Sequence, residues 1–195
     1  FEEDVLLLGG VGEETVDDGV LQSSAKRFTW LLVNLGTAVL ASMVIGMFDA
    51  TIEQMVALAV LMPIVASMGG NAGTQTLTIT VRALATKELT AYNALRTFRK
   101  ELAVGFLNGC LFAGIAGALT VFWFRELENA NMLGGIIAGA MVINMVVAGF
   151  SGVALPVLLD RLKIDPAIAS GVFVTTVTDV VGFLSFLGLA SATLL

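Results

Sequence analysis

The chain has 195 residues, of which 57% are hydrophobic and only 13% are charged, and its net charge is −6. Soluble domains carry about twice that share of charged residues, so the composition excludes an ordinary soluble protein and predicts an all-α membrane protein. The chain has one cysteine, Cys110, and no histidine. This excludes an internal disulfide, a Cys-rich metal site and the usual histidine sites for zinc, copper or iron. A metal that binds here must use oxygen ligands, which suit hard cations such as magnesium and calcium.

The N-terminal part of the chain differs from the rest. Seven of the sixteen acidic residues lie within the first eighteen positions. From position 28 onward the chain is dominated by five apolar segments, each long enough to cross a hydrocarbon layer about 30 Å thick. They cover residues 28–48, 55–81, 102–124, 132–159 and 166–195. We therefore expect five transmembrane helices per subunit.

The basic residues predict the orientation of these spans. With the N-terminus inside, nine of the ten lysines and arginines fall on the inner side, and only Arg125 lies outside. Because this bias follows the positive-inside rule, we expect the N-terminus inside and the C-terminus outside. The same topology leaves four acids outside, namely Asp49, Glu53, Glu126 and Glu128. These acids either concentrate cations at an outer mouth or are ordinary polar loop residues.

The second span combines a proline with three closely spaced glycines. Pro63 removes a backbone donor, and Gly69, Gly70 and Gly73 follow it. Together they predict a second helix that is broken at membrane depth, where free carbonyls can line an aqueous cavity and coordinate cations. Side-chain oxygens nearby belong to Asn71, Thr74 and Gln75. The alternative is a kinked helix whose glycines serve close packing.

Small residues recur along the third and fourth spans. On the third they are Gly105, Gly109, Ala113 and Gly117, at four-residue spacing, and on the fourth they are Gly135 and Gly139. Faces of this kind let helices approach closely in lipid. We expect the close approach within one chain, with a subunit interface as the alternative.

The fifth span holds a charge deep inside an apolar stretch. Asp165 and Pro166 are suited to the N-cap and the first position of a helix. Asp179 follows Pro166 by thirteen residues, a rise of roughly 20 Å, which places its carboxylate near the middle of the membrane. Such a charge usually faces a partner or a water-filled path. The alternative is a structural carboxylate that is bonded to Thr or Asn of another helix, or held protonated. The polar face around it comprises Gly171, Thr175, Thr178, Asp179 and Gly182.

Three asparagines lie one in each remaining span. They are Asn34, Asn108 and Asn144. We expect them to form hydrogen bonds between helices rather than to bind an ion, because amide side chains commonly link helices in membranes.

Two motifs, at residues 63–75 and 175–182, closely resemble the membrane domain of the MgtE-type magnesium channels, and residues 30–35 are similar as well. The resemblance covers nearly the whole chain. It implies a homodimer with its ion path on the two-fold axis, where Asp179 of each subunit binds a hydrated magnesium ion, the transported ion. The further oxygen ligands that the resemblance implies come from Ser67, Gly70, Asn71, Thr74, Gln75 and Thr175.

The resemblance also implies a division of the chain. Residues 1–27 would be an acidic cytoplasmic tail or linker from a missing regulatory region that contains CBS domains, and residues 28–195 would be the five-helix pore domain. Asp165 would help to bind a regulatory ion. The expected location is the bacterial inner membrane, in contact with lipid and divalent cations and with no nucleic-acid partner.

The predicted activity is passive uptake of magnesium. A membrane potential that is negative inside favours entry of a double charge by roughly 4.6 kcal/mol per 100 mV, and the sequence contains no phosphate-binding loop. The alternative is a divalent-cation exchanger coupled to sodium or protons, which a titratable Asp179 would also suit. An intramembrane enzyme is not expected, because there is no histidine and no second intramembrane carboxylate for catalysis.

Overall fold

A computed structural model describes residues 17–90 and 92–194. These residues form α-helices and connecting turns without a β-strand, so most of the acidic segment at residues 1–27 lies outside the described part. The helices are α2 (Val20–Gly46), α3 (Asp49–Gln54), α4 (Ala57–Ala85), α5 (Ala94–Trp123), α6 (Ala130–Arg161) and α7 (Pro166–Leu194). Within this part of the chain, five helices are long and apolar enough to cross a membrane. The prediction of an all-α protein with five spans is confirmed.

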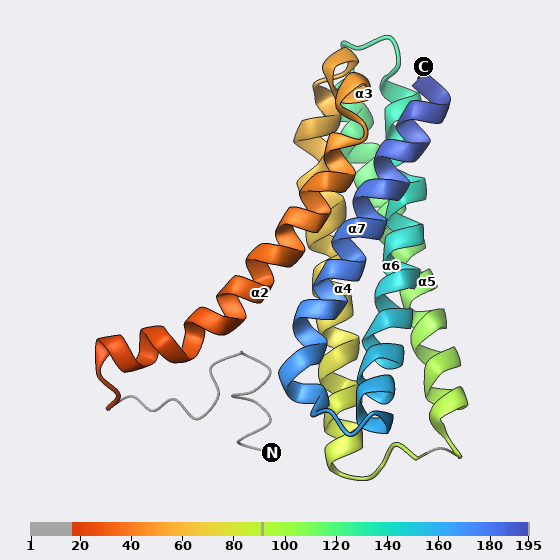
Figure 1. The fold of residues 1–195 in the computed structure, drawn as a ribbon. Coiled ribbons are helices and arrows are strands. Elements are labelled where there is room, and N and C mark those ends of the chain that lie inside the picture. The colour runs from red at the N-terminus through yellow and green to blue at the C-terminus, as the bar shows by residue number, and fades with distance from the viewer. Residues whose placement is uncertain (1–16, 91, 195) are drawn as a thin grey trace.

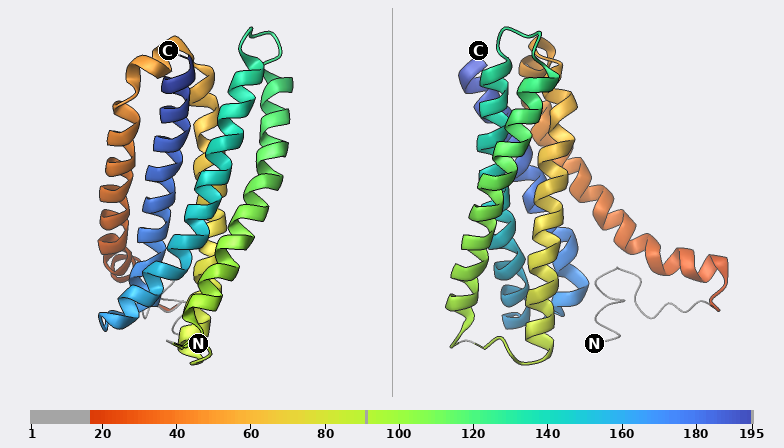
Figure 2. Two further views of the ribbon diagram at one scale, coloured as in Figure 1. Left: turned by 90° about the vertical axis from the view of Figure 1, so that its right-hand side faces the viewer. Right: turned by 180° about the vertical axis from the view of Figure 1, so that it is seen from behind.

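The helices form a bundle with α4, α6 and α7 at its centre, each packed against the other two. Helix α5 packs along α6, and α2 lies along α7 and diverges from the bundle toward its own N-terminal end (Figures 1 and 2). The start of α2 and the end of α7 lie at opposite ends of the bundle, as an odd number of spans requires (Figure 1). Of the residues in α2, only Ala41 is buried, so this helix contributes little to the core.

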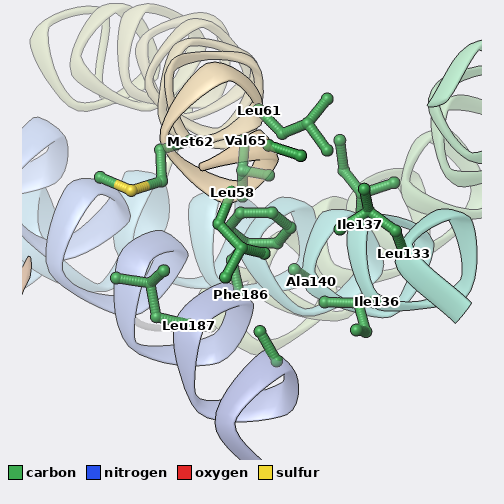
Figure 3. Packing of buried hydrophobic residues seen from close by; sticks show 12 residues of the cluster. Leu58, Leu61, Met62, Val65, Leu133, Ile136, Ile137, Ala140, Phe186 and Leu187 are labelled. Atoms are coloured by element: carbon green, nitrogen blue, oxygen red, sulfur yellow. The ribbon is translucent and has the colours of Figure 1, made fainter. Parts of the chain in front are cut away.

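The largest apolar cluster joins the central helices in the half of the bundle nearest α3. Leu58 and Leu61 of α4 meet Ile137 of α6 and Phe186 of α7, and all four side chains are fully buried (Figure 3). Lipid tails are as apolar as these side chains, so in a membrane the cluster stabilises the bundle through close van der Waals packing rather than through removal from water.

The predicted small-residue face of α5 packs against α6 of the same chain. A side chain added at Gly105 would place its Cβ 2.6 Å from the carbonyl oxygen of Met145, and one at Gly117 would lie 3.0 Å from that of Gly134. The prediction of packing within one chain is confirmed for α5. For α6 it is met at Gly139, where an added Cβ would lie 3.3 Å from Leu189 of α7, but it is wrong at Gly135, which has open space around it. Gly134, one residue earlier, makes the contact with α5. A shift of one residue turns a side chain by about 100°, which decides the face it occupies.

The start of α7 agrees with its sequence. The helix begins at Pro166, and the backbone N–H of Ala167 donates a 2.8 Å hydrogen bond to Oδ1 of Asp165. The carboxylate therefore satisfies one of the free donors of the first turn.

Helix α4 differs from the broken helix that we predicted. The structure describes it as one continuous α-helix with Pro63 inside. Pro63 is the seventh residue of α4, so the carbonyl that its missing donor and its ring affect belongs to the third residue, close to the start of the helix. The glycines that follow take helical conformations and allow neighbouring helices to approach, as the packing alternative required.

A buried carboxylate joins α4 to α5 on the side of the bundle where α4 ends. Glu101 is 4% exposed, and its Oε2 accepts a 3.2 Å hydrogen bond from the hydroxyl of Thr76. Its Oε1 lies 3.5 Å from Nζ of the exposed Lys100. Gly149 of α6 makes room here, since a Cβ at that position would lie 2.6 Å from the carbonyl oxygen of Glu101.

The close contact of α5 with α6 at glycine positions can be tested by two matched substitutions on α5. We expect Gly105→Ala to lower the stability of the bundle by about 1–3 kcal/mol, because the new methyl group meets backbone that cannot move aside. Gly114→Ala is the control, since nothing lies within 4 Å of that position. It should be neutral or stabilising by up to about 1 kcal/mol. Thermal unfolding in detergent measures both, and equal midpoints would contradict this packing.

The contact of Glu101 with Thr76 can be tested by a double-mutant cycle. We expect Glu101→Ala to destabilise the bundle by about 1–3 kcal/mol, because it leaves the buried Thr76 hydroxyl without its acceptor. Glu101→Gln retains an acceptor oxygen and should cost less. Combined with Thr76→Val, the Glu101→Ala change should show a coupling of about 0.5 kcal/mol or more in thermal unfolding, and purely additive effects would count against the hydrogen bond.

Candidate functional site

A stripe of polar side chains lies exposed along the middle of α4. It begins at Ser67, passes Asn71 and Gln75, and ends at Thr78, with Thr74 on the same side. The spacings of three and four residues place all of them on one face of the helix. Because lipid cannot bond polar groups, such a face needs water or protein opposite it.

The two threonine hydroxyls of this stripe donate to their own helix. Thr74 bonds the carbonyl oxygen of Gly70 at 2.9 Å, and Thr78 bonds that of Thr74 at 2.8 Å. The amide of Asn71 lies 3.5 Å from the hydroxyl oxygen of Ser67. The threonine hydroxyl protons are thus occupied within the helix, and the oxygen lone pairs that remain can accept bonds from the water shell of a cation or bind the cation itself.

Asp179 lies half-buried in the middle of α7. Among the residues that the structure describes, none forms a hydrogen bond or an ion pair with its carboxylate. The alternative of a structural carboxylate bonded to Thr or Asn of another helix therefore finds no partner within this part of the chain. One turn earlier, the hydroxyl of Thr175 donates to the carbonyl oxygens of Gly171 at 3.1 Å and Val172 at 3.0 Å.

Glycines bring the two sequence motifs together. A Cβ at Gly73 of α4 would lie 2.6 Å from Val174 and 3.5 Å from Thr178, both on α7. A Cβ at Gly70 would lie 4.0 Å from the hydroxyl oxygen of Thr178, the residue next to Asp179. The second and fifth spans therefore pack directly on each other at the level of the predicted site.

The described part of one chain does not bring together a cluster of acidic ligands. In the described residues there is no group of three or more Asp, Glu, Cys or His side chains placed to hold a metal. Asp165 lies at the start of α7, fourteen residues from Asp179, which corresponds to roughly 21 Å along the helix. A cation near Asp179 would therefore depend on the oxygens of the α4 stripe, on water or on groups from outside this chain.

Asn144 of α6 joins both helices that carry the motifs. Its side chain is completely buried, and its Nδ2 donates a 2.9 Å hydrogen bond to the carbonyl oxygen of Val65 on α4. The prediction of a hydrogen bond between helices is thus confirmed for Asn144. It is not met by Asn34, which is exposed, or by Asn108, which is half-buried, since neither side chain bonds another helix in the described structure.

Sequence reasoning did not single out Glu101. Its place beside Arg99 and Lys100 suggested a connecting segment, whereas α5 begins at Ala94 and carries Glu101 into the bundle. The available signal was Gly105, one turn later and at the head of the small-residue face, because a helix face that packs closely buries the residues on the same side.

Comparisons with known proteins identify the family of this chain. Residues 62–189 match the family model MgtE, described as "Divalent cation transporter". The chain is 29% identical over 192 residues to "Magnesium transporter MgtE" of Bacillus subtilis (strain 168), covering 98% of this chain and 42% of that protein. It is 32% identical over 184 residues to the protein of the same name of Enterococcus faecalis, covering 94% of this chain and 40% of that protein. It is also 32% identical over 191 residues to that of Thermus thermophilus, covering 96% of this chain and 41% of that protein.

The chain thus spans about two fifths of the length of these curated relatives. The family match covers both motifs and all of the α4 stripe. The chain belongs to the MgtE family of divalent cation transporters.

Proposed function

We propose that this chain is the pore region of a magnesium transporter, in which Asp179 and the polar stripe of α4 line the path of the ion. The observation that carries the proposal is the exposed polar stripe in the middle of α4, a helix that packs against α7, where Asp179 is half-buried and has no partner among the described residues. The curated relatives are named magnesium transporters, which supports the choice of ion.

The chemistry of the stripe suits a hydrated cation. Magnesium gives up its water reluctantly and favours one or two carboxylates with further oxygen ligands. The proposed ligands are Asp179 together with Ser67, Gly70, Asn71, Thr74, Gln75 and Thr175. We place the site on the two-fold axis of a homodimer, where two Asp179 carboxylates would repel each other until a divalent cation neutralises both. The exposed polar face of α4 would then face the path instead of lipid.

The proposed transport is passive. With the N-terminus inside a bacterial cell, the membrane potential draws the cation inward by roughly 4.6 kcal/mol per 100 mV for a double charge. Residues 1–27 would connect the pore to a cytoplasmic regulatory region. Coupled exchange predicts a different result, because uptake by an exchanger stops when its counter-ion is removed, whereas uptake through a channel continues.

The assignment of Asp179 can be tested in proteoliposomes that contain the purified chain. We expect Asp179→Ala to reduce magnesium uptake to the level of empty vesicles, because the site loses its only charge. Asp179→Asn keeps the shape and should lower the preference for divalent over monovalent cations. The measurement is magnesium uptake into the vesicles, followed with a fluorescent magnesium indicator at an imposed membrane potential.

Asp160→Asn is the matched control, since Asp160 is exposed near the end of α6 and away from the stripe. It should transport like the unchanged protein. Normal uptake by Asp179→Ala, with the same amount of folded protein in the vesicles, would overturn the proposed site.

A further inference from the structure

The buried amide of Asn144 fills the space between α4 and α7, the two helices that carry the proposed site; this space is called the seam below. Asn144 lies near the middle of α6 and is fully buried. A Cβ at Gly69 of α4 would overlap its amide group, and a Cβ at Gly182 of α7 would lie 2.7 Å from its Nδ2. Both glycines thus leave space that this one side chain occupies.

The position of the seam relates it to the site. Gly69 precedes Asn71 by two residues, and Gly182 follows Asp179 by three, which is within one helical turn in each case. The hydrogen bond from Nδ2 to the carbonyl oxygen of Val65 is 2.9 Å long and ties α6 to α4 one turn before Gly69. The amide of Asn144 therefore lies against both α4 and α7, and it is hydrogen-bonded to α4.

Stability alone gives a poor account of this residue. The Oδ1 of Asn144 is buried without a hydrogen-bond partner in the described structure. Burying an unsatisfied acceptor costs more free energy than a hydrogen bond between helices in a membrane contributes on average. A side chain without polar atoms would avoid that cost, although leucine, with the same branching at Cγ, is larger than asparagine and would crowd the site. The amide is better explained by what it holds in place.

We propose that Asn144 is a positioning residue for the cation site, and that its bond to the Val65 carbonyl fixes the setting of the α4 stripe relative to Asp179. The inference rests on the proposed function, since it concerns the same site. It adds a residue of α6, a helix that contributes none of the proposed ligands.

The test compares substitutions of Asn144 in the proteoliposome assay. We expect Asn144→Leu to raise the magnesium concentration for half-maximal uptake by about tenfold and to lower the preference for magnesium over calcium, with a smaller change in the maximal rate. Because leucine is larger than asparagine in this fully buried site, overpacking should also lower the midpoint of thermal unfolding by several degrees. Asn144→Ala cannot clash with either glycine, so it should give the same transport phenotype if the leucine variant does not fold.

Ser151→Ala on α6 is the control. Ser151 is also buried, but its hydroxyl donates to the carbonyls of Val147 and Ala148 in its own helix, so its loss should leave the half-maximal concentration unchanged. Folded Asn144 variants with unchanged half-maximal concentration and ion preference would overturn the positioning role. Asp179→Ala in the same assay separates the two proposals. If it abolishes uptake while the folded Asn144 variants transport normally, only the role of Asn144 fails; if Asp179→Ala itself transports normally, the proposed site fails.

Discussion

The structure depends on the close approach of α4, α6 and α7 at positions that lack side chains. A side chain added at any of three glycines would place its Cβ too close to atoms of a neighbouring helix; they are Gly69, Gly73 and Gly182. In lipid this matters more than in water, because burying apolar surface between helices provides no comparable driving force and contact has to come from close packing and a few hydrogen bonds. The amide of Asn144 occupies the space that two of these glycines leave, so one polar side chain and its glycine neighbours set the geometry of the central three helices.

The same packing explains how a polar stripe can exist in the middle of the membrane. The buried face of α4 is held by α6 and α7, which leaves its opposite face exposed with Asn71 and Gln75 on it. A face of this kind is costly against lipid and acceptable against water or another subunit. Together with Asp179, it is the basis of our proposal that the ion path forms between two copies of the chain. Membership of a family of divalent cation transporters makes magnesium the natural cargo to test.

Particular residues show how far sequence patterns predicted this structure and where they stopped. The five spans, the N-cap at Asp165 and the small-residue face of α5 followed from hydropathy, capping preferences and four-residue spacing, all of which are local properties. These patterns did not predict whether Gly134 or Gly135 packs against α5, because the two adjacent glycines differ only in which neighbouring helix they face. The burial of Glu101 was missed for the same reason. A carboxylate beside two basic residues is typical of an exposed loop, and only the packed structure shows that the Thr76 hydroxyl of another helix is its hydrogen-bond donor.

The sequence by itself determined the class of the protein, its five membrane helices, its restriction to oxygen ligands and the motifs of the candidate site. These features depend on composition and on spacing along one helix. Only the tertiary structure decided that α4 is continuous, that its glycines serve as packing surfaces and that Asn144 lies between the two motif-bearing helices. A proline and three glycines permit either a break or a tight contact. Which one forms depends on whether neighbouring helices can fill the space, and that is a property of the whole bundle.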